Sequence, residues 1–266
     1  MADTFRLPSD IDWSICLETV FTEEPVFERR IRDAAGAGFR TVEFWCWRAK
    51  DIARIADAAA ASGIRIAGFV AEPMVPLTHP KHHDDFLEGL TRSLETAQTL
   101  GARILIVQAG DALPDIGLLA QRAAVVDCLR RAANVLDGTD VVLALEPLNT
   151  VLDHPGYFLD RTTLGLEIVA EVDHPNVRLL YDIYHAAMMG EAMTATLLDR
   201  IDLVAHVHLA DIPGRHEPGS GKLDWQDRLS RLFDAGYRGA VGLEFRPERD
   251  SVSALATFRA ALDNRG

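Results

Sequence analysis

Four polar residues in the second half of the chain each stand at the end of a short apolar run. Glu146 follows VVLAL, Asp182 follows VRLLY, His208 closes LVAHVH, and Glu244 follows AVGL. Two glutamates, one aspartate and one histidine form a hard, oxygen-rich ligand set with a single nitrogen. Such a set suits a divalent metal ion (Mn²⁺, Mg²⁺ or Co²⁺) better than a structural zinc, which favours thiolates or several imidazoles.

A single carboxylate at the end of an apolar run is more commonly an ion-pair partner or a cap for the next helix. Four such residues, each interrupting an apolar run, are harder to explain in that way. An unpaired buried carboxylate costs on the order of several kcal/mol, so we expect a cation to compensate the charge.

The stretch 203–221, LVAHVHLADIPGRHEPGSG, has the most closely spaced polar side chains that could take part in binding or catalysis. His206 and His208 are two residues apart in a run that predicts a strand, so both imidazoles should lie on the same face. The loop that follows contains Arg215 and Glu217 between prolines and glycines, which is more polar chemistry than a turn requires.

The elements that must position these residues alternate regularly along the chain. Apolar runs predict strands at 13–17, 41–45, 64–69, 103–107, 141–145, 177–181, 203–208 and 240–243. Helical patterns follow at 25–37, 51–61, 84–100, 118–136, 163–172, somewhere within 186–200, 225–235 and 252–262. This alternation predicts an α/β fold, a (β/α)8 TIM barrel, as a single domain over 1–266. Functional residues of such barrels lie at the carboxyl ends of the strands, so the four ligands should converge at one mouth.

Composition and charge limit the classes of partner that this chain is expected to bind. The chain has 27 basic and 40 acidic side chains and a formal net charge of −13, which argues against a nucleic-acid partner. Its three cysteines are too few and too scattered for a disulfide framework, and we expect them reduced in a cytoplasmic protein. No signal peptide and no apolar run of about 18 residues is visible, so no membrane partner is expected.

Several longer motifs resemble a known family. They are FTEEPVFERR, TVEFW, LEPLN with DHPGYFL, YDIYH, HLADIPGRHEPGSG and GYRGAVGLEFRP, and together they span residues 21–247. These motifs resemble the xylose-isomerase-like TIM barrels of sugar isomerases and epimerases, and most of all the hydroxypyruvate isomerase subgroup. Barrels of this family often associate, so a homo-oligomer is among the expectations.

The resemblance also implies roles for individual residues. Glu146, Asp182, His208 and Glu244 would bind one divalent ion, and the two glutamates would act as the acid/base pair. His185 and Arg215 match positions that hold substrate oxygens. Weaker candidates around the site are Glu217, also for substrate binding, and His206.

The function expected from these residues is a metal-dependent isomerase that acts on a short α-hydroxy carbonyl compound through an enediolate. The expected substrate is a small hydroxy-keto acid, with hydroxypyruvate converted to tartronate semialdehyde, because the planar fork of Arg215 suits a carboxylate. A salt bridge of Arg215 to Glu217 or Asp211 that shapes the loop is an equal alternative for this residue. An alternative is a ketose 3-epimerase acting on a free sugar, because hydroxypyruvate isomerases commonly have Gln where this chain has His208. Two further alternatives are phosphodiester cleavage, which the acidic charge disfavours, and a barrel that binds a small ligand without turnover.

The sequence does not decide the roles of two groups of side chains near the first strands. Trp45, Trp47 and Phe69 either wall a small pocket or pack the barrel. The histidines of the stretch AEPMVPLTHPKHHDD are expected to be solvated loop residues rather than ligands; they are His79, His82 and His83.

Overall fold

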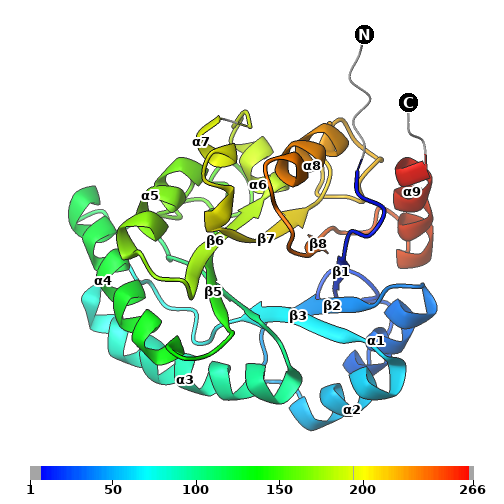
Figure 1. Ribbon diagram of the computed structural model, residues 1–266, viewed down its shortest axis with the longest axis horizontal. Helices are drawn as coiled ribbons and strands as arrows, with labels where there is room; N and C mark the ends of the chain where they lie inside the picture. Colours follow the sequence, from blue (N-terminus) through cyan, green and yellow to red (C-terminus); the bar gives the residue numbers. More distant parts are fainter. Residues whose placement is uncertain (1–6, 194, 264–266) are drawn as a thin grey trace.

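The computed structural model describes residues 7–193 and 195–263. Eight parallel strands close into a barrel in chain order, with β1 pairing both β2 and β8. Helices surround the strands on the outside (Figure 1). The strands are β1 (Trp13–Cys16), β2 (Thr41–Phe44), β3 (Arg65–Val70), β4 (Ile104–Val107), β5 (Val142–Leu145), β6 (Val177–Asp182), β7 (Val204–Leu209) and β8 (Val241–Leu243). The predicted single-domain (β/α)8 barrel is confirmed.

The helices follow the strands as the alternation predicts. They are α1 (Phe27–Gly36), α2 (Ile52–Ser62), α3 (His83–Leu100), α4 (Leu118–Leu136), α5 (Thr162–Val172), α6 (Ile183–Met188), α7 (Ala195–Leu198), α8 (Trp225–Asp234) and α9 (Ser251–Asp263). The expectation of a helix within 186–200 is confirmed by α7, but α6 begins earlier than that range, directly after β6. Asp182 caps it by accepting a hydrogen bond from the backbone N–H of His185 at 2.9 Å. Residue 194, inside that range, lies outside the described residues.

Local signals explain where several helices begin and end. Asp51 caps α2 by accepting from the backbone N–H of Arg54. At the carboxyl ends of α2 and α3, Gly63 and Gly101 adopt left-handed conformations with φ of 64° and 65°. A residue with a Cβ is disfavoured there, so glycine stops each helix and returns the chain to the next strand.

The inside of the barrel is divided into an apolar and a polar side. Val70, Ile106, Ala144 and Leu180, from β3 to β6, form a small buried cluster of their own, separate from the larger core between sheet and helices. Strands β1, β2, β7 and β8 instead carry buried polar side chains or no side chain at corresponding inner positions. These are Ser14, Thr41, Glu43, His206, His208 and Gly242. The polar side lies next to the mouth where the ligands were expected.

One loop expectation is wrong. His83 is fully buried, and its Nε2 lies 3.0 Å from the carbonyl oxygen of Leu77. It begins α3 and lies on the same face as Phe86 and Leu90, three and seven residues later, which are also buried. His79 and His82 are partly exposed and fit the expectation. Among the described helices, none combines the length and the apolar character needed to cross a bilayer.

Candidate metal centre and active site

The four predicted ligands meet at the carboxyl ends of neighbouring strands. Glu146 follows β5, Asp182 ends β6, His208 lies near the end of β7 and Glu244 follows β8. One ligand atom from each lies within 4.8 Å of those of the other three, and all four side chains are buried. The structure therefore brings together the four residues that were expected at one mouth.

His208 faces the three carboxylates with one particular ring nitrogen. Its Nδ1 lies 3.3 Å from Glu244 Oε2, 3.4 Å from Glu146 Oε1 and 3.9 Å from Asp182 Oδ2. This buried Nδ1 has no hydrogen-bond partner within the described part of the chain. A ring nitrogen left without a partner among three carboxylates is the arrangement that a shared cation satisfies.

The charges around this site also fit a divalent ion. Counting the neighbouring Glu43, the buried carboxylates number four, and Arg215 is the guanidinium buried among them. Four negative charges against one positive charge leave an excess of three, before any charge on the histidines. Buried carboxylates in such excess are stable only if they are protonated or compensated by a cation.

The pKa shifts of these residues are consistent with the excess of buried negative charge. Burial raises the pKa of Asp182, although Arg215 and His208 oppose the shift. Burial would also raise the pKa of Glu244, but Arg215 and His208 hold it well below its usual range. Burial would lower the pKa of His208, yet Glu43 and Glu244 raise it well above its ordinary value. The protein's own charges therefore favour a proton on His208, at the place where a metal ion would compete for Nδ1.

Glu244 is held by two donors besides its place at the metal centre. Trp45 Nε1 donates to Glu244 Oε1 at 2.6 Å, and an Arg215 terminal nitrogen donates to Oε2. The Arg215 guanidinium also lies over the Tyr184 ring, 5.2 Å from its centroid. Neither a salt bridge of Arg215 to Asp211 nor one to Glu217 is formed, although both partners were considered from the sequence.

The loop after β7 is shaped to present Arg215. Asp211 is buried, and its carboxylate accepts hydrogen bonds from the backbone N–H groups of Ile212, Gly219, Gly221 and Leu223. Arg215 itself adopts a left-handed conformation with φ of 57°, which is uncommon for a residue with a Cβ. Such strain persists only where surrounding contacts fix it. Here the backbone N–H of Arg246 donates to the carbonyl oxygen of Arg215 at 2.7 Å, and that of Asp211 donates to the carbonyl oxygen of His216 at 2.9 Å.

His185 is oriented by the loop after β5. The backbone N–H of Asn149 donates to His185 Nδ1 at 3.1 Å, so in the neutral ring the proton resides on Nε2. Burial lowers the pKa of His185 to about 4, which leaves the ring neutral at pH 7. Its Nε2 is buried without a partner among the described residues, 3.7 Å from Asp182 Oδ2. It is therefore an available donor beside the metal centre.

A cavity of about 350 Å³ opens above these groups. Its lining residues are Trp45, Cys46, Val70, Met74, Ile106, Gln108, Glu146, Leu148, Asp153, His154, His185, His208, Arg215, Glu244 and Arg246. The lining combines apolar residues such as Val70, Ile106 and Leu148 with two arginines, and it includes three of the four predicted ligands. A pocket of this size with a few convergent polar groups fits a small polar ligand.

Other candidates from the sequence lie elsewhere. Glu217 is not among the lining residues, and its Oε2 accepts from the backbone N–H of Glu248. Of the three aromatic candidates, Trp45 lines the cavity. Trp47 donates to Ser93, and the Phe69 ring stacks on Phe44 in the core.

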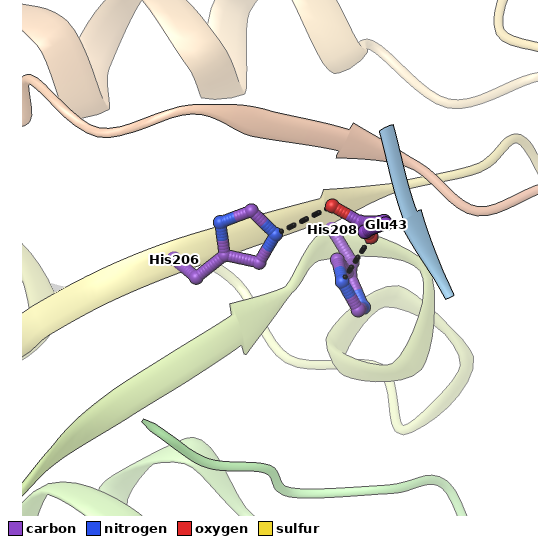
Figure 2. A group of neighbouring side chains, drawn as sticks. All are labelled: Glu43, His206 and His208. Carbon is purple, nitrogen blue, oxygen red and sulfur yellow. Dashed lines mark hydrogen bonds and ion pairs between the residues drawn. The ribbon is translucent and has the colours of Figure 1, made fainter. Parts of the chain in front are cut away.

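Sequence reasoning missed Glu43, whose carboxylate contacts both histidines of β7 (Figure 2). Burial would raise its pKa, but the adjacent His208 and His206 rings hold it at about 2. Glu43 lies within an apolar run in the motif TVEFW, and a charged residue inside a strand of a buried parallel sheet was the available signal. His206, a weaker candidate from the sequence, is the partner that links Glu43 to β7.

The fold is that of a TIM barrel, and comparison with known proteins identifies its family. The family model described as xylose isomerase-like TIM barrel matches residues 31–262, and the chain belongs to this family. A human protein named "Putative hydroxypyruvate isomerase" is 34% identical, over 98% of this chain and 96% of its own length. A 2-oxo-tetronate isomerase of Cupriavidus necator is 31% identical, over 90% of this chain and 94% of its own. The crystal structure of an AP endonuclease, family 2, from Brucella melitensis has a TM-score of 0.88 at 30% identity, covering 94% of this chain and 98% of that one.

Proposed function

We propose that the protein is a metal-dependent isomerase of a short hydroxy-keto acid, which converts hydroxypyruvate to tartronate semialdehyde through an enediolate. The observation that carries the proposal is the convergence of four potential ligands, Glu146, Asp182, His208 and Glu244, beside a small cavity that three of them line together with two arginines. The names of the human and Cupriavidus relatives support the reaction class.

Two glutamates would move the proton. A divalent ion held by the four ligands supplies Lewis-acid polarisation of a carbonyl oxygen and compensates the charge of an enediolate. One carboxylate of the pair Glu146 and Glu244 accepts a proton from C3 of hydroxypyruvate, and the pair returns a proton to C2. The C3–H bond breaks, the C2–H bond forms, and a proton passes from the C3 oxygen to the C2 oxygen. The donors from Trp45 and Arg215 keep Glu244 ionised and fixed in place.

Three further groups would bind the substrate. The Nε2–H of the neutral His185 is free to donate to a substrate oxygen. Arg215 is committed to Glu244 through one terminal nitrogen, so only its remaining N–H groups could face the substrate. The exposed Arg246 lines the same cavity and offers a second guanidinium. We assign the substrate carboxylate to these two arginines.

The ketose 3-epimerase is the second candidate, because the site contains an imidazole ligand at His208, as the epimerases of the family do. In that reaction the same glutamates would return the proton to the same carbon from the opposite face. The name of the Brucella protein raises phosphodiester cleavage, but a net charge of −13 is unsuited to a polyanionic substrate.

Proton NMR in D₂O with Mg²⁺-loaded protein separates these candidates. We expect deuterium to enter hydroxypyruvate and tartronate semialdehyde to form, while fructose and tagatose remain unchanged. Exchange at C3 of a ketose with hydroxypyruvate inert would replace the isomerase by the epimerase. If no compound exchanged, although the metal were bound, the proposal of an isomerase acting on hydroxypyruvate would be wrong.

A further inference from the structure

A second buried cluster lies against the metal centre and shares His208 with it. Glu43 comes from β2, and His206 and His208 come from β7, so β1 and β8 lie between the two strands in the sheet. The three side chains therefore meet across the inside of the barrel rather than along one strand. Figure 2 shows both rings directed at the same carboxylate.

Each oxygen of Glu43 has its own imidazole partner. His206 Nε2 is hydrogen-bonded to Glu43 Oε2 at 3.0 Å. His208 Nε2 lies 2.8 Å from Glu43 Oε1 in an ion-pair contact, and neither of these two buried atoms has a hydrogen-bond partner within the described part of the chain. The three side chains are at most 3% exposed. The buried carboxylate is thus contacted from two sides.

The barrel makes room for this pair at Gly242. This β8 residue pairs with His208 in the sheet register. A Cβ at Gly242 would lie 2.4 Å from Glu43 Oε1 and 2.6 Å from His208 Cδ2, both too close. The backbone at Gly242 is not in the left-handed region, so glycine is required by space and not by conformation. The contact between Glu43 and His208 therefore depends on a position that carries no side chain.

The two nitrogens of His208 consequently have different tasks. A carboxylate at Nε2 places the proton of the neutral ring on Nε2 and leaves the lone pair on Nδ1. That Nδ1 is the atom that faces Glu146, Asp182 and Glu244. A carboxylate in contact with the distal nitrogen also makes an imidazole a more basic ligand.

We propose that Glu43 is a positioning residue that fixes the orientation and tautomer of His208, and that His206 anchors Glu43. The trio strengthens the nitrogen ligand of the metal centre and so favours Co²⁺, which binds imidazole well, over Mg²⁺, which prefers oxygen ligands. This inference rests on the metal centre of the proposed function and not on the identity of the substrate.

The test compares Co²⁺ and Mg²⁺ affinities of the wild type and Glu43→Gln by calorimetry, without substrate. Glutamine keeps the size of the glutamate side chain. Its NH₂ group, however, faces one of the two imidazole N–H groups, and two donors cannot form a hydrogen bond with each other. We expect the Kd for Co²⁺ to rise about 10- to 100-fold and that for Mg²⁺ to rise much less. Equal weakening of both ions, or no change, would overturn the proposal, since a merely structural role predicts no shift in their ratio.

Glu72→Gln is the matched control, because Glu72 is a partly buried carboxylate whose Oε2 accepts from the backbone N–H groups of Trp47 and Arg48. It should leave the affinity ratio unchanged. The ¹⁵N NMR spectrum of the Mg²⁺-loaded wild type should show His208 protonated at Nε2, whereas protonation at Nδ1 would contradict the assignment.

A second pair of variants serves if Glu43→Gln does not fold. His206→Leu removes the donor to Glu43 Oε2, whereas His206→Gln keeps an N–H group at a similar reach. We expect Co²⁺ affinity to fall in His206→Leu and to be largely restored in His206→Gln. Equal affinities in the two variants would contradict the anchoring role.

The number of ions bound per chain tests the remaining alternative, in which Glu43 and His206 are ligands of a second ion. We expect one ion per chain, as the shared His208 predicts. Two ions per chain, with one lost in Glu43→Gln, would instead make Glu43 and His206 ligands of a second ion and overturn the positioning role. Since all readouts are of ion binding, a wrong substrate in the proposed function would leave this outcome unchanged.

Discussion

Replacing Arg215 by methionine tests how far the metal centre depends on its internal counter-charge. Arg215 is 7% exposed, donates to Glu244 and has the carboxylates of Asp182 and Glu146 as further neighbours. Methionine keeps much of the side-chain volume and contact with Tyr184 but removes the positive charge. The variant leaves Glu244 buried without its guanidinium.

The expected loss of unfolding free energy follows from the buried carboxylate of Glu244 that is left without its partner. Breaking a buried ion pair by removing one partner costs about 3–5 kcal/mol, which for a chain of this size lowers Tm by roughly 10 °C. In the wild type the folded-state pKa of Glu244 is depressed, so its contribution to stability is complete above its unfolded pKa and is lost only at lower pH. Without Arg215 that pKa rises, because the largest of the charges that oppose the effect of burial is lost and His208 remains. The deficit should therefore be largest at pH 7 and smaller at pH 5, where the stranded carboxylate takes up a proton.

Urea unfolding of the chelator-treated protein at pH 7 and pH 5 measures this effect. Arg215→Lys, which keeps a charge, should recover part of the loss, and Arg246→Met, at an exposed arginine of the same cavity, should lose little. Added Mn²⁺ should stabilise Arg215→Met by supplying the missing positive charge. A variant as stable as the wild type at pH 7 would refute the view that Arg215 compensates these carboxylates.

Three further outcomes follow from the site. Trp45→Phe keeps the aromatic wall but removes the donor to Glu244 Oε1, so kcat/KM should fall about tenfold or more, and the unfolding free energy should fall by about 1–3 kcal/mol because a buried carboxylate oxygen loses its donor; unchanged kinetics would refute the role of this hydrogen bond. Arg246→Ala should raise the KM for hydroxypyruvate about tenfold and leave kcat nearly unchanged, and steady-state kinetics showing an unaltered KM would remove Arg246 from carboxylate binding. Mn²⁺ binding at pH 7 should release close to one proton, because the raised pKa of His208 keeps that ring protonated until the ion displaces the proton. Calorimetry in buffers of different ionisation enthalpy measures the number of protons released, and a release of zero would contradict the prediction.

The barrel could be predicted from sequence because its signals are local. Apolar runs that alternate with helical patterns, and glycines such as Gly63 and Gly101 at helix ends, define each unit without knowledge of its neighbours. The start of α6 was missed because the cap is Asp182, which the sequence marks equally well as a ligand at the end of a strand. His83 was misplaced because three histidines in a proline-containing stretch indicate a loop, and the burial of its helix face depends on tertiary packing.

The meeting of Glu146, Asp182, His208 and Glu244 was predictable for a similar reason, since parallel strands bring their carboxyl ends to one mouth whatever their exact register. Contacts across the inside of the barrel were not predictable. The pairing of Glu43 with both histidines depends on strand tilt and on the space left by Gly242, neither of which sequence spacing encodes. Likewise, Arg215 was expected to bind substrate, and only its approach to Glu244 in three dimensions identifies it also as a counter-ion.

An anomalous difference map from crystals of the protein soaked with Mn²⁺ tests the metal centre most directly. We predict one strong peak, at about 2.0–2.3 Å from a carboxylate oxygen of each of Glu146, Asp182 and Glu244 and from Nδ1 of His208. A peak bound through Nε2 of His208, or no peak among these four residues at saturating Mn²⁺, would contradict the account.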